Sequence, residues 1–397
     1  MRKTYLDNNA TTPLHPEVMQ VLKDSLNLFG NASSEHFFGQ EARKAVEDAR
    51  KKVASLINAQ PGEIIFTSCG SESNNLVIKG VTCQDVYCKS EQSHPGKHII
   101  TSQIEHPSVM KPIKSLERQG FKVTWLPVDK YGLVDPGLVE KAITKQTVLI
   151  SIMTANNEIG TIEPVAELAQ IARKHEVYFH TDAVQAVGKL KIDVQEMGVD
   201  FLSLSGHKLY APKGVAALYI RPGVNVCPVL QGGHQERGLR GGTENTLGII
   251  ALGKACEIAA RDRAENVKKI WKLREKLRQG ILEKIPEVVV NGHPEKMLPT
   301  TLSVIFKYIE GESILLRLSS QGIAVSTGSA CSSGTLEPSH VLLAIGLPHE
   351  LAHGTIRFSL GSENTEEDID YTMEVLPGVI QELRQMSPLW PGNKSAC

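Results

Sequence analysis

Short apolar runs alternate with amphipathic segments through the first two thirds of the chain. Runs of strand length occur at 64–67, 98–101, 122–126, 148–153, 177–180, 199–204 and 216–220, and helical patterns follow several of them. Strands that alternate with helices form mostly parallel sheets with helices on both faces. The pattern therefore predicts an α/β fold built on a mostly parallel central sheet.

The two ends of the chain have a different pattern. Residues 5–13 are polar and lack helical periodicity, which indicates an extended arm that crosses to another part of the fold. Helices are predicted near 15–27 and 40–57. A charged helix over 255–284 is followed by strands such as 288–290 and 302–305, which predicts a second, smaller α+β domain. The tail after Met386 has two prolines and no period, so we expect it to be loosely ordered.

Charge and hydropathy narrow the class of partner. The 397 residues include 43 basic and 44 acidic side chains, so electrostatics do not favour nucleic acid or an anionic membrane as the main partner. The first residues lack the apolar core of a signal peptide, and no apolar segment is long enough to span a bilayer. We expect a cytoplasmic protein that binds a small molecule or another protein.

The seven cysteines are scattered along the chain and do not form a disulfide framework. Cys83 and Cys88 have neither a second pair nor a nearby ligand cluster, so no metal site is predicted. Cys331 lies in a segment of small residues between Gly328 and Gly334, which would let it move as an arm. A small buried cysteine is the alternative, but the polar surroundings favour a reactive thiol.

Lys208 follows the apolar run 199–204 within the segment Ser205-Gly206-His207-Lys208. Ligands of open α/β sheets bind at the carboxyl ends of the strands, and a partly desolvated lysine there can act as an amine nucleophile. The hypothesis is a lysine that forms a Schiff base with an aldehyde cofactor. The alternative is a surface lysine in an ordinary turn.

A cofactor with an aldehyde, a ring and a phosphate also needs side chains that bind the ring and amides that bind the phosphate. Residues at the ends of other predicted strands are candidates for these roles. Asp182 could pair with a ring nitrogen, although it could equally cap the next helix. Gln185, one turn on, could bond the ring hydroxyl. Gly70 and Ser71 open a helix directly after a strand and offer amide donors for phosphate. His106 could stack on the ring and move protons, or it could be an ordinary loop histidine.

Six motifs, in order, resemble those of the pyridoxal-phosphate-dependent cysteine desulfurases, and they cover nearly the whole chain. They are Leu6-Asp7-Asn8-Asn9-Ala10-Thr11-Thr12, Gly70-Ser71-Glu72-Ser73-Asn74-Asn75, Asn156-Asn157-Glu158-Ile159-Gly160, Ser205-Gly206-His207-Lys208, Arg240-Gly241-Gly242-Thr243-Glu244-Asn245 and Ser329-Ala330-Cys331. The sequences of residues 233–237 and 386–390 are most similar to those of the nitrogen-fixation (NifS-like) type.

The resemblance implies the fold type I of pyridoxal-phosphate-dependent transferases, which is the fold of aspartate aminotransferase. It implies a large cofactor domain over 15–255 and a small domain made of 1–14 and 256–397. The small domain would carry the catalytic-cysteine loop at about 324–336. It also implies a homodimer.

The resemblance also assigns roles to individual residues. Lys208 would hold pyridoxal 5'-phosphate, His106 would stack on its ring, and Asp182 would pair with the ring nitrogen. The remaining contacts would be Asn157 and Gln185 to the ring oxygen, Gly70, Ser71, Ser205 and His207 to the phosphate, Thr243 to the phosphate of the partner subunit, and Arg357 with Asn157 to the substrate. Position 71 is serine where many members have threonine, which keeps the hydroxyl.

The activity that the resemblance implies is conversion of L-cysteine to L-alanine, with the sulfur carried as a persulfide on Cys331. The acceptor would be an iron–sulfur scaffold or another sulfur-acceptor protein, including one for nitrogenase maturation, and Cys331 would touch the cluster only during transfer. Alternatives are a sulfur donor for tRNA or DNA modification, a selenocysteine lyase, a non-catalytic scaffold and an aminotransferase. A scaffold would not need Lys208, Asp182, His106 and Cys331 together, and an aminotransferase would not need the cysteine.

Overall fold

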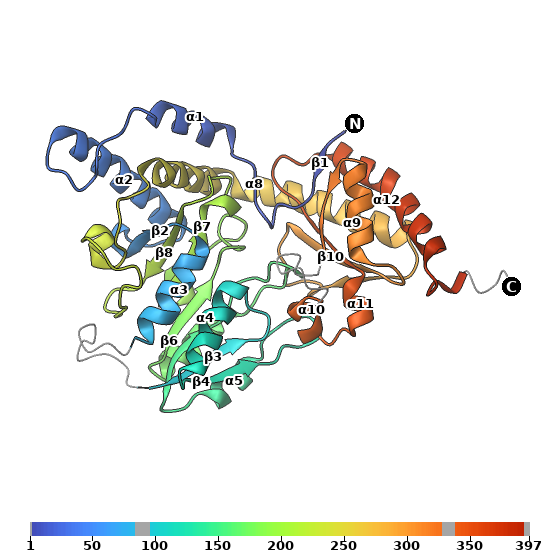
Figure 1. Ribbon diagram of the computed structural model, residues 1–397, viewed down its shortest axis with the longest axis horizontal. Helices are drawn as coiled ribbons and strands as arrows, with labels where there is room; N and C mark the ends of the chain where they lie inside the picture. The colour runs from blue at the N-terminus through green and yellow to red at the C-terminus, as the bar shows by residue number, and fades with distance from the viewer. Residues whose placement is uncertain (1, 84–95, 328–337, 393–397) are drawn as a thin grey trace.

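A computed structural model describes residues 2–83, 96–327 and 338–392. Its centre is a seven-stranded sheet with strand order β2-β8-β7-β6-β5-β3-β4 (Figure 1). The strands are β2 (Ile64–Thr67), β3 (His98–Ser102), β4 (Lys122–Leu126), β5 (Thr147–Ser151), β6 (Tyr178–Asp182), β7 (Phe201–Ser205) and β8 (Ala216–Ile220). The five strands from β7 to β4 run parallel, whereas β8 is antiparallel to both of its neighbours. The predicted α/β fold with a mostly parallel sheet is confirmed.

Helices cover both faces of this sheet because successive side chains of a strand point to opposite faces. Ile64 and Phe66 belong to a core with α2, α6 and the first part of α8, whereas Ile65 belongs to a core with α3 and α4. The helices of this part are α1 (Pro16–Ser25), α2 (Phe37–Leu56), α3 (Gly70–Val81), α4 (Pro107–Arg118), α5 (Pro136–Ala142), α6 (Val165–Lys174), α7 (Val194–Met197) and α8 (Thr246–Lys284).

A second sheet with the strand order β12-β13-β10-β9 is antiparallel and has its own core. Leu6, the second part of α8 and the helices α9 and α12 pack on it. The elements of this part are β1 (Thr4–Tyr5), β9 (Val288–Asn291), β10 (Thr301–Phe306), α9 (Gly311–Ser320), β11 (Ile323–Ala324), β12 (Ser326–Thr327), α10 (His340–Ala344), α11 (His349–His353), β13 (Thr355–Ser359) and α12 (Glu366–Met386).

The N-terminal arm crosses between these two parts, as predicted. Strand β1 pairs with β11, Asp7 then bridges to Ser359 of β13, and the Thr12 amide bonds to the carbonyl oxygen of His207 at 2.9 Å. The arm therefore joins the second sheet to the turn that carries Lys208.

Two expectations about the C-terminal half were wrong in detail. Helix α8 begins at Thr246, nine residues before the predicted start, and its 39 residues run from the first core into the second. The tail is packed against the rest of the chain, and not loose, over the described residues 387–392. Trp390 packs edge-on against Tyr308 with ring centroids 5.4 Å apart, and Arg384 lies over its ring at 4.7 Å.

Within residues 2–83, 96–327 and 338–392, no helix combines the length and the apolar character needed to cross a bilayer. The same ranges contain no group of three or more His, Cys, Asp or Glu side chains that could hold a metal ion.

Candidate active site

Two neighbouring parallel strands place the predicted residues Lys208 and Asp182 at one edge of the sheet. Strand β6 ends at Asp182, which is in register with Ser203 of β7, and β7 leads into the turn Gly206–Lys208. Because carboxyl ends of parallel strands meet at the same edge, Lys208 and Asp182 face the same space.

The amine of Lys208 is held by uncharged oxygens. Its Nζ donates to the backbone carbonyl of Asn9 and to that of Ala10 at 2.7 Å. Desolvation, with a smaller contribution from the nearby Arg357, lowers the pKa of Lys208 to about 8. A lowered pKa increases the fraction of uncharged, nucleophilic amine at neutral pH.

Asp182 is 7% exposed and both of its oxygens are bonded. Oδ2 accepts from Asn74 Nδ2 at 2.7 Å, and Oδ1 accepts from the Val184 amide at 3.0 Å. The Val184 contact is the local bond expected of a capping residue, but residues 183–190 form turns and not a helix. Asp182 is therefore a fixed carboxylate at the sheet edge, not a helix cap.

The start of α3 lies beside Ser205 and forms a cradle of donors. A Cβ built on Gly70 would lie 2.8 Å from Val184 Cγ2 and 3.6 Å from Ser205 Cβ, so only glycine allows this approach without a shift. Among the described residues, the buried Ser205 hydroxyl has no hydrogen-bond partner. An unpartnered buried hydroxyl next to a helix N-terminus fits a phosphate, because both would donate to its oxygens.

Two histidines lie near the residues of this cradle, His207 in the turn after Ser205 and His106 in a groove with Ser71. His207 Nδ1 pairs with Thr11 Oγ1 at 3.2 Å, and desolvation followed by Lys208 lowers the pKa of His207 to about 4. His106 follows β3, caps α4 through the Ser108 amide, and lines an open groove of about 440 Å³ together with Ser71. Desolvation and the nearby Lys208 also lower the pKa of His106. Both rings are thus kept largely uncharged at neutral pH.

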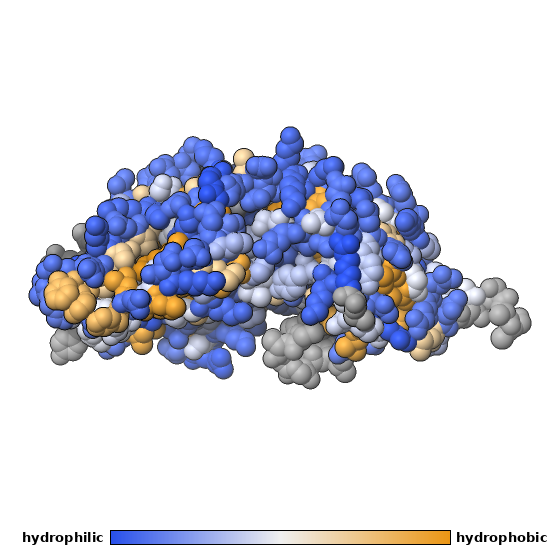
Figure 2. All heavy atoms as spheres, turned by 90° about the horizontal axis from the view of Figure 1, so that it is seen from above, coloured by the Kyte–Doolittle hydropathy of each residue, from blue (hydrophilic) through white to orange (hydrophobic). Residues whose placement is uncertain are grey.

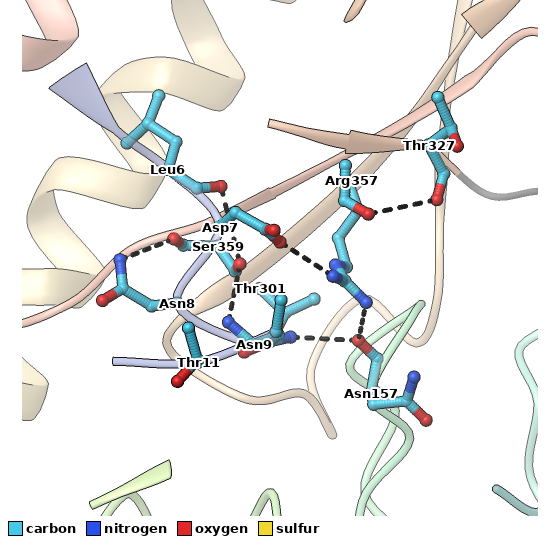
Figure 3. Close-up of polar contacts among 12 residues, drawn as sticks. Leu6, Asp7, Asn8, Asn9, Thr11, Asn157, Thr301, Thr327, Arg357 and Ser359 are labelled. Carbon is cyan, nitrogen blue, oxygen red and sulfur yellow. Dashed lines mark hydrogen bonds and ion pairs between the residues drawn. The ribbon is translucent and has the colours of Figure 1, made fainter. Parts of the chain in front are cut away.

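Arg357 reaches the site from the second sheet (Figure 3). Its NH2 donates to Asp7 Oδ1 at 2.9 Å, and its NH1 donates to the backbone carbonyl of Asn157 at 3.1 Å. Its buried Nε has no partner among the described residues. The guanidinium retains donor capacity for an anion at the wall of the site.

The amides of Asn157 and Gln185 have different surroundings. Asn157 contacts Arg357 only through its backbone oxygen, and its side chain points away from that arginine (Figure 3). Gln185 Nε2 donates to the Asn9 carbonyl at 2.9 Å, and its Oε1 accepts from Lys189 at 2.6 Å. Gln185 therefore belongs to the floor of the site next to Lys208.

Sequence reasoning missed Asn9, Asp7 and Lys189. The Asn9 carbonyl accepts from Lys208 and Gln185, and its side chain bonds to the Asn157 carbonyl at 3.0 Å and to Thr301 Oγ1 at 2.8 Å. Desolvation and the nearby Lys208 lower the pKa of Lys189 to about 7. Asn9 and Asp7 were signalled by the run of polar residues in the extended arm and by the first of the six motifs, but neither signal assigned them a role.

Thr243 is not part of this cluster. Thr243 is exposed and lines a separate pocket with Ser68 and Arg240, apart from the cavity lined by Lys208. Cys331 lies outside the described residues. Within one chain, the described site therefore contains an amine, a carboxylate, a phosphate cradle and a guanidinium.

This donor set fits pyridoxal phosphate. An amine with a lowered pKa suits an aldehyde, Asp182 suits a ring nitrogen, and the unpartnered Ser205 hydroxyl at the start of α3 suits a phosphate. The groups of Lys208, Asp182 and Gly70 come from the ends of three strands of one sheet, as the fold requires.

Comparison with known proteins gives consistent matches over most or all of the chain. The model of the aminotransferase class-V family matches residues 4–372. The cysteine desulfurase IscS of Dictyoglomus turgidum is 52% identical over 399 residues, covering 100% of both chains. A solved NifS-like protein superposes with a TM-score of 0.89 at 40% identity, covering 96% of this chain and 100% of that chain. The structure of SspA in complex with cysteine superposes with a TM-score of 0.79 at 37% identity, covering 91% of this chain and 100% of that chain.

Proposed function

Because the chain belongs to the aminotransferase class-V family and is a pyridoxal-phosphate-dependent cysteine desulfurase, we propose that it works through Lys208 and Cys331 and supplies sulfur for iron–sulfur cluster assembly. The observation that carries these roles is the position of Lys208 and Asp182 at the ends of β7 and β6, beside the unpartnered Ser205 hydroxyl.

The cofactor, when bound, supplies an aldehyde that joins an amine and a pyridine ring that withdraws electrons from the substrate Cα. Lys208 would hold the cofactor aldehyde through its amine, and the same amine lies where it would take the proton from the substrate Cα. Asp182, fixed by Asn74, holds a proton on the ring nitrogen. Gly70, Ser71, Ser205 and His207 bind the phosphate, His106 stacks on the ring, and Gln185 and Asn157 bond its oxygen.

Arg357 binds the carboxylate of L-cysteine. The guanidinium already holds Asp7 and the Asn157 carbonyl, and its Nε has no partner among the described residues. A carboxylate that accepts two parallel N–H bonds is oriented as well as bound. We infer that Arg357 and Asn157 fix the substrate so that its Cα faces Lys208.

Cys331 receives the sulfur. Its thiolate attacks the sulfur of the bound cysteine, so that a sulfur–sulfur bond forms while the carbon–sulfur bond breaks and leaves its electron pair with the substrate carbon. That carbon takes up a proton, Cα regains the proton that Lys208 removed, and alanine is released. The outer sulfur of the persulfide then passes to a scaffold for iron–sulfur clusters, of which nitrogenase maturation would be a specialised case.

The test is production of alanine from L-cysteine by purified protein. We expect Cys331→Ser to bind the cofactor as the parent does but to release no alanine. Cys83→Ser, at a cysteine two residues beyond the last residue of α3, is the matched control and should behave like the parent. Alanine released by Cys331→Ser at the parental rate would refute the role of Cys331.

We also propose a homodimer, with Thr243 reaching the cofactor phosphate of the partner subunit. Phe29, Phe37 and Phe38 form an aromatic cluster that is 74%, 63% and 39% exposed. Apolar side chains gather at the end of the molecule where α1 and α2 meet (Figure 2). Exposed apolar patches of this kind commonly mark interfaces.

Sedimentation velocity tests the dimer. Phe37→Asp should lower the sedimentation coefficient to that of a monomer, whereas Leu389→Asp, which is equally exposed but lies in the tail, should leave it unchanged. A parent that sediments as a monomer would refute the proposal.

The same family supports a division into a cofactor domain over 15–255 and a small domain over 1–14 and 256–397 that carries the cysteine loop. We propose a cytoplasmic location, because a reducing compartment keeps the catalytic thiol reduced.

A further inference from the structure

A buried ion pair lies behind the junction between β2 and α3, defined here as residues 66–72. Arg50 of α2 and Glu236 are joined by two bonds of 2.8 Å, with side chains that are 7% and 3% exposed. The same Glu236 Oε2 accepts from the Phe66 amide at 2.7 Å, and the Arg50 guanidinium lies 4.6 Å from the centre of the Phe66 ring. The pair thus binds the last part of β2 directly.

The backbone at Glu236 is strained. Glu236 and Arg237 have φ of 45° and 58°, a left-handed conformation that costs free energy for any residue with a side chain. The Arg237 side chain donates to the Ile64 carbonyl at 3.0 Å, as the Arg50 NH1 does at 2.9 Å. These bonds hold a turn that the chain would otherwise avoid, and such strain is common at functional sites.

The same loop contacts the junction at a second point, four residues further on. Arg240 donates to Glu72 Oε1 at 2.8 Å, and Glu72 Oε2 accepts from the Ser68 amide at 2.8 Å. Desolvation alone would raise the pKa of Glu72, but the bonds from Arg240 and Ser68 lower it below its usual range. Glu72 is thus a bonded carboxylate within the first turn of α3, directly after Ser71.

We propose that the Arg50–Glu236 pair positions the phosphate cradle, because it fixes loop 236–240 against the junction at Phe66 and at Glu72. Neither Arg50 nor Glu236 lines the cavity with Lys208, and Glu236 lines the separate pocket with Ser68 and Thr243, so we treat the pair as positioning residues and not as ligands. This inference rests on the proposed function in one respect, which is that Gly70 and Ser71 bind the phosphate of the cofactor. Partners behind a set of ligands can change affinity about tenfold or more when they are removed.

The test compares two probes that differ only in the phosphate. Full-length protein is resolved from its cofactor and titrated with pyridoxal phosphate and with pyridoxal, and binding is followed by absorbance. For Glu236→Gln we expect the dissociation constant for pyridoxal phosphate to rise about tenfold, while that for pyridoxal changes less than about twofold. Arg43→Met on the same helix, whose pair with Glu35 is exposed, should keep the parental preference.

A second variant separates positioning from stability. A lone buried charge can unfold a protein, whereas replacing both partners of a buried pair by apolar residues is often tolerated. Arg50→Met combined with Glu236→Met should therefore unfold near the parental temperature and still lose the preference for the phosphate, because the bond to the Phe66 amide is gone.

Three outcomes would overturn the proposal. They are a phosphate preference within about twofold of the parent in Glu236→Gln, the same result in the stable double variant, and a parent without any preference. The third outcome would also refute the phosphate cradle itself. A parent that keeps the preference but makes no alanine from cysteine would refute the proposed desulfurase residues and leave this inference standing.

Discussion

Gly188 should be far less tolerant of alanine than a glycine with the same backbone in open space. Its φ is +78°, and a Cβ there would lie 2.2 Å from Leu209 Cδ2 and 3.6 Å from Ala259 Cβ. The left-handed conformation costs a residue with a Cβ about 1–2 kcal/mol. Overpacking against the buried Leu209 adds about 1–3 kcal/mol, so we expect Gly188→Ala to destabilise the fold by about 2–5 kcal/mol. Because Leu209 follows Lys208, cofactor binding should weaken as well.

Gly120→Ala is the matched control. Gly120 has φ of +92°, and no atom lies within 4 Å of the Cβ position, so only the backbone cost of about 1–2 kcal/mol applies. Urea unfolding followed by circular dichroism compares the midpoints of the parent and the two variants, since a chain with several cores need not unfold in two states. Equal midpoints for Gly188→Ala and Gly120→Ala would show that the contact with Leu209 costs nothing and would refute the reasoning.

Three further predictions concern charge at the site. Burial raises the pKa of Glu105 to about 8, so the folded chain binds more protons than the unfolded chain between about pH 4.5 and 8 and loses stability as the pH rises through that window. In Glu105→Gln, the melting temperature should therefore fall less between pH 5 and pH 8 than in the parent. An equal fall of the melting temperature in parent and variant would contradict the raised pKa of Glu105. Arg357→Lys should raise the KM for L-cysteine about tenfold, because an ammonium lacks two parallel donors; a KM within twofold of the parent would count against carboxylate binding. Asp182→Asn should lower kcat at least about tenfold through loss of a charged bond, and near-parental turnover at pH 7 would exclude its role at the ring nitrogen.

The alternation of strands and helices was enough to predict where most of the site lies. Lys208, Asp182 and Gly70 each follow an apolar run, and parallel strands bring their carboxyl ends to one edge. The motif that ends in Lys208 is local in sequence, and so is the glycine-serine start of α3. Features of this kind depend on neighbouring residues, which is why the sequence reveals them.

Contacts between distant parts of the chain could not be predicted. Asn9 meets Lys208 across 199 positions, and no local pattern indicates which polar residue of the arm will do so. The start of α8 was placed too late because Gly248 and Gly253 weaken the helical pattern. In the fold, Gly253 lies against Ala49 of α2, where a Cβ would come within 2.7 Å of the Ala49 Cα, so tertiary packing decides the helix boundary.

The path of the N-terminal arm has a consequence for biosynthesis. The arm leaves the ribosome before the segments that it contacts, because Leu6 packs in the core of the second sheet and Asn8 Nδ2 donates to the Ser359 carbonyl at 3.0 Å, 351 positions away. Contacts so far apart in sequence form late in folding. Asn9, whose carbonyl accepts the hydrogen bond from Lys208, therefore cannot take up its native position until β13 has been translated. A nascent or truncated chain that stops before Ser359 would lack the finished lysine environment, so the amine of Lys208 acquires its native surroundings only after β13 has been made.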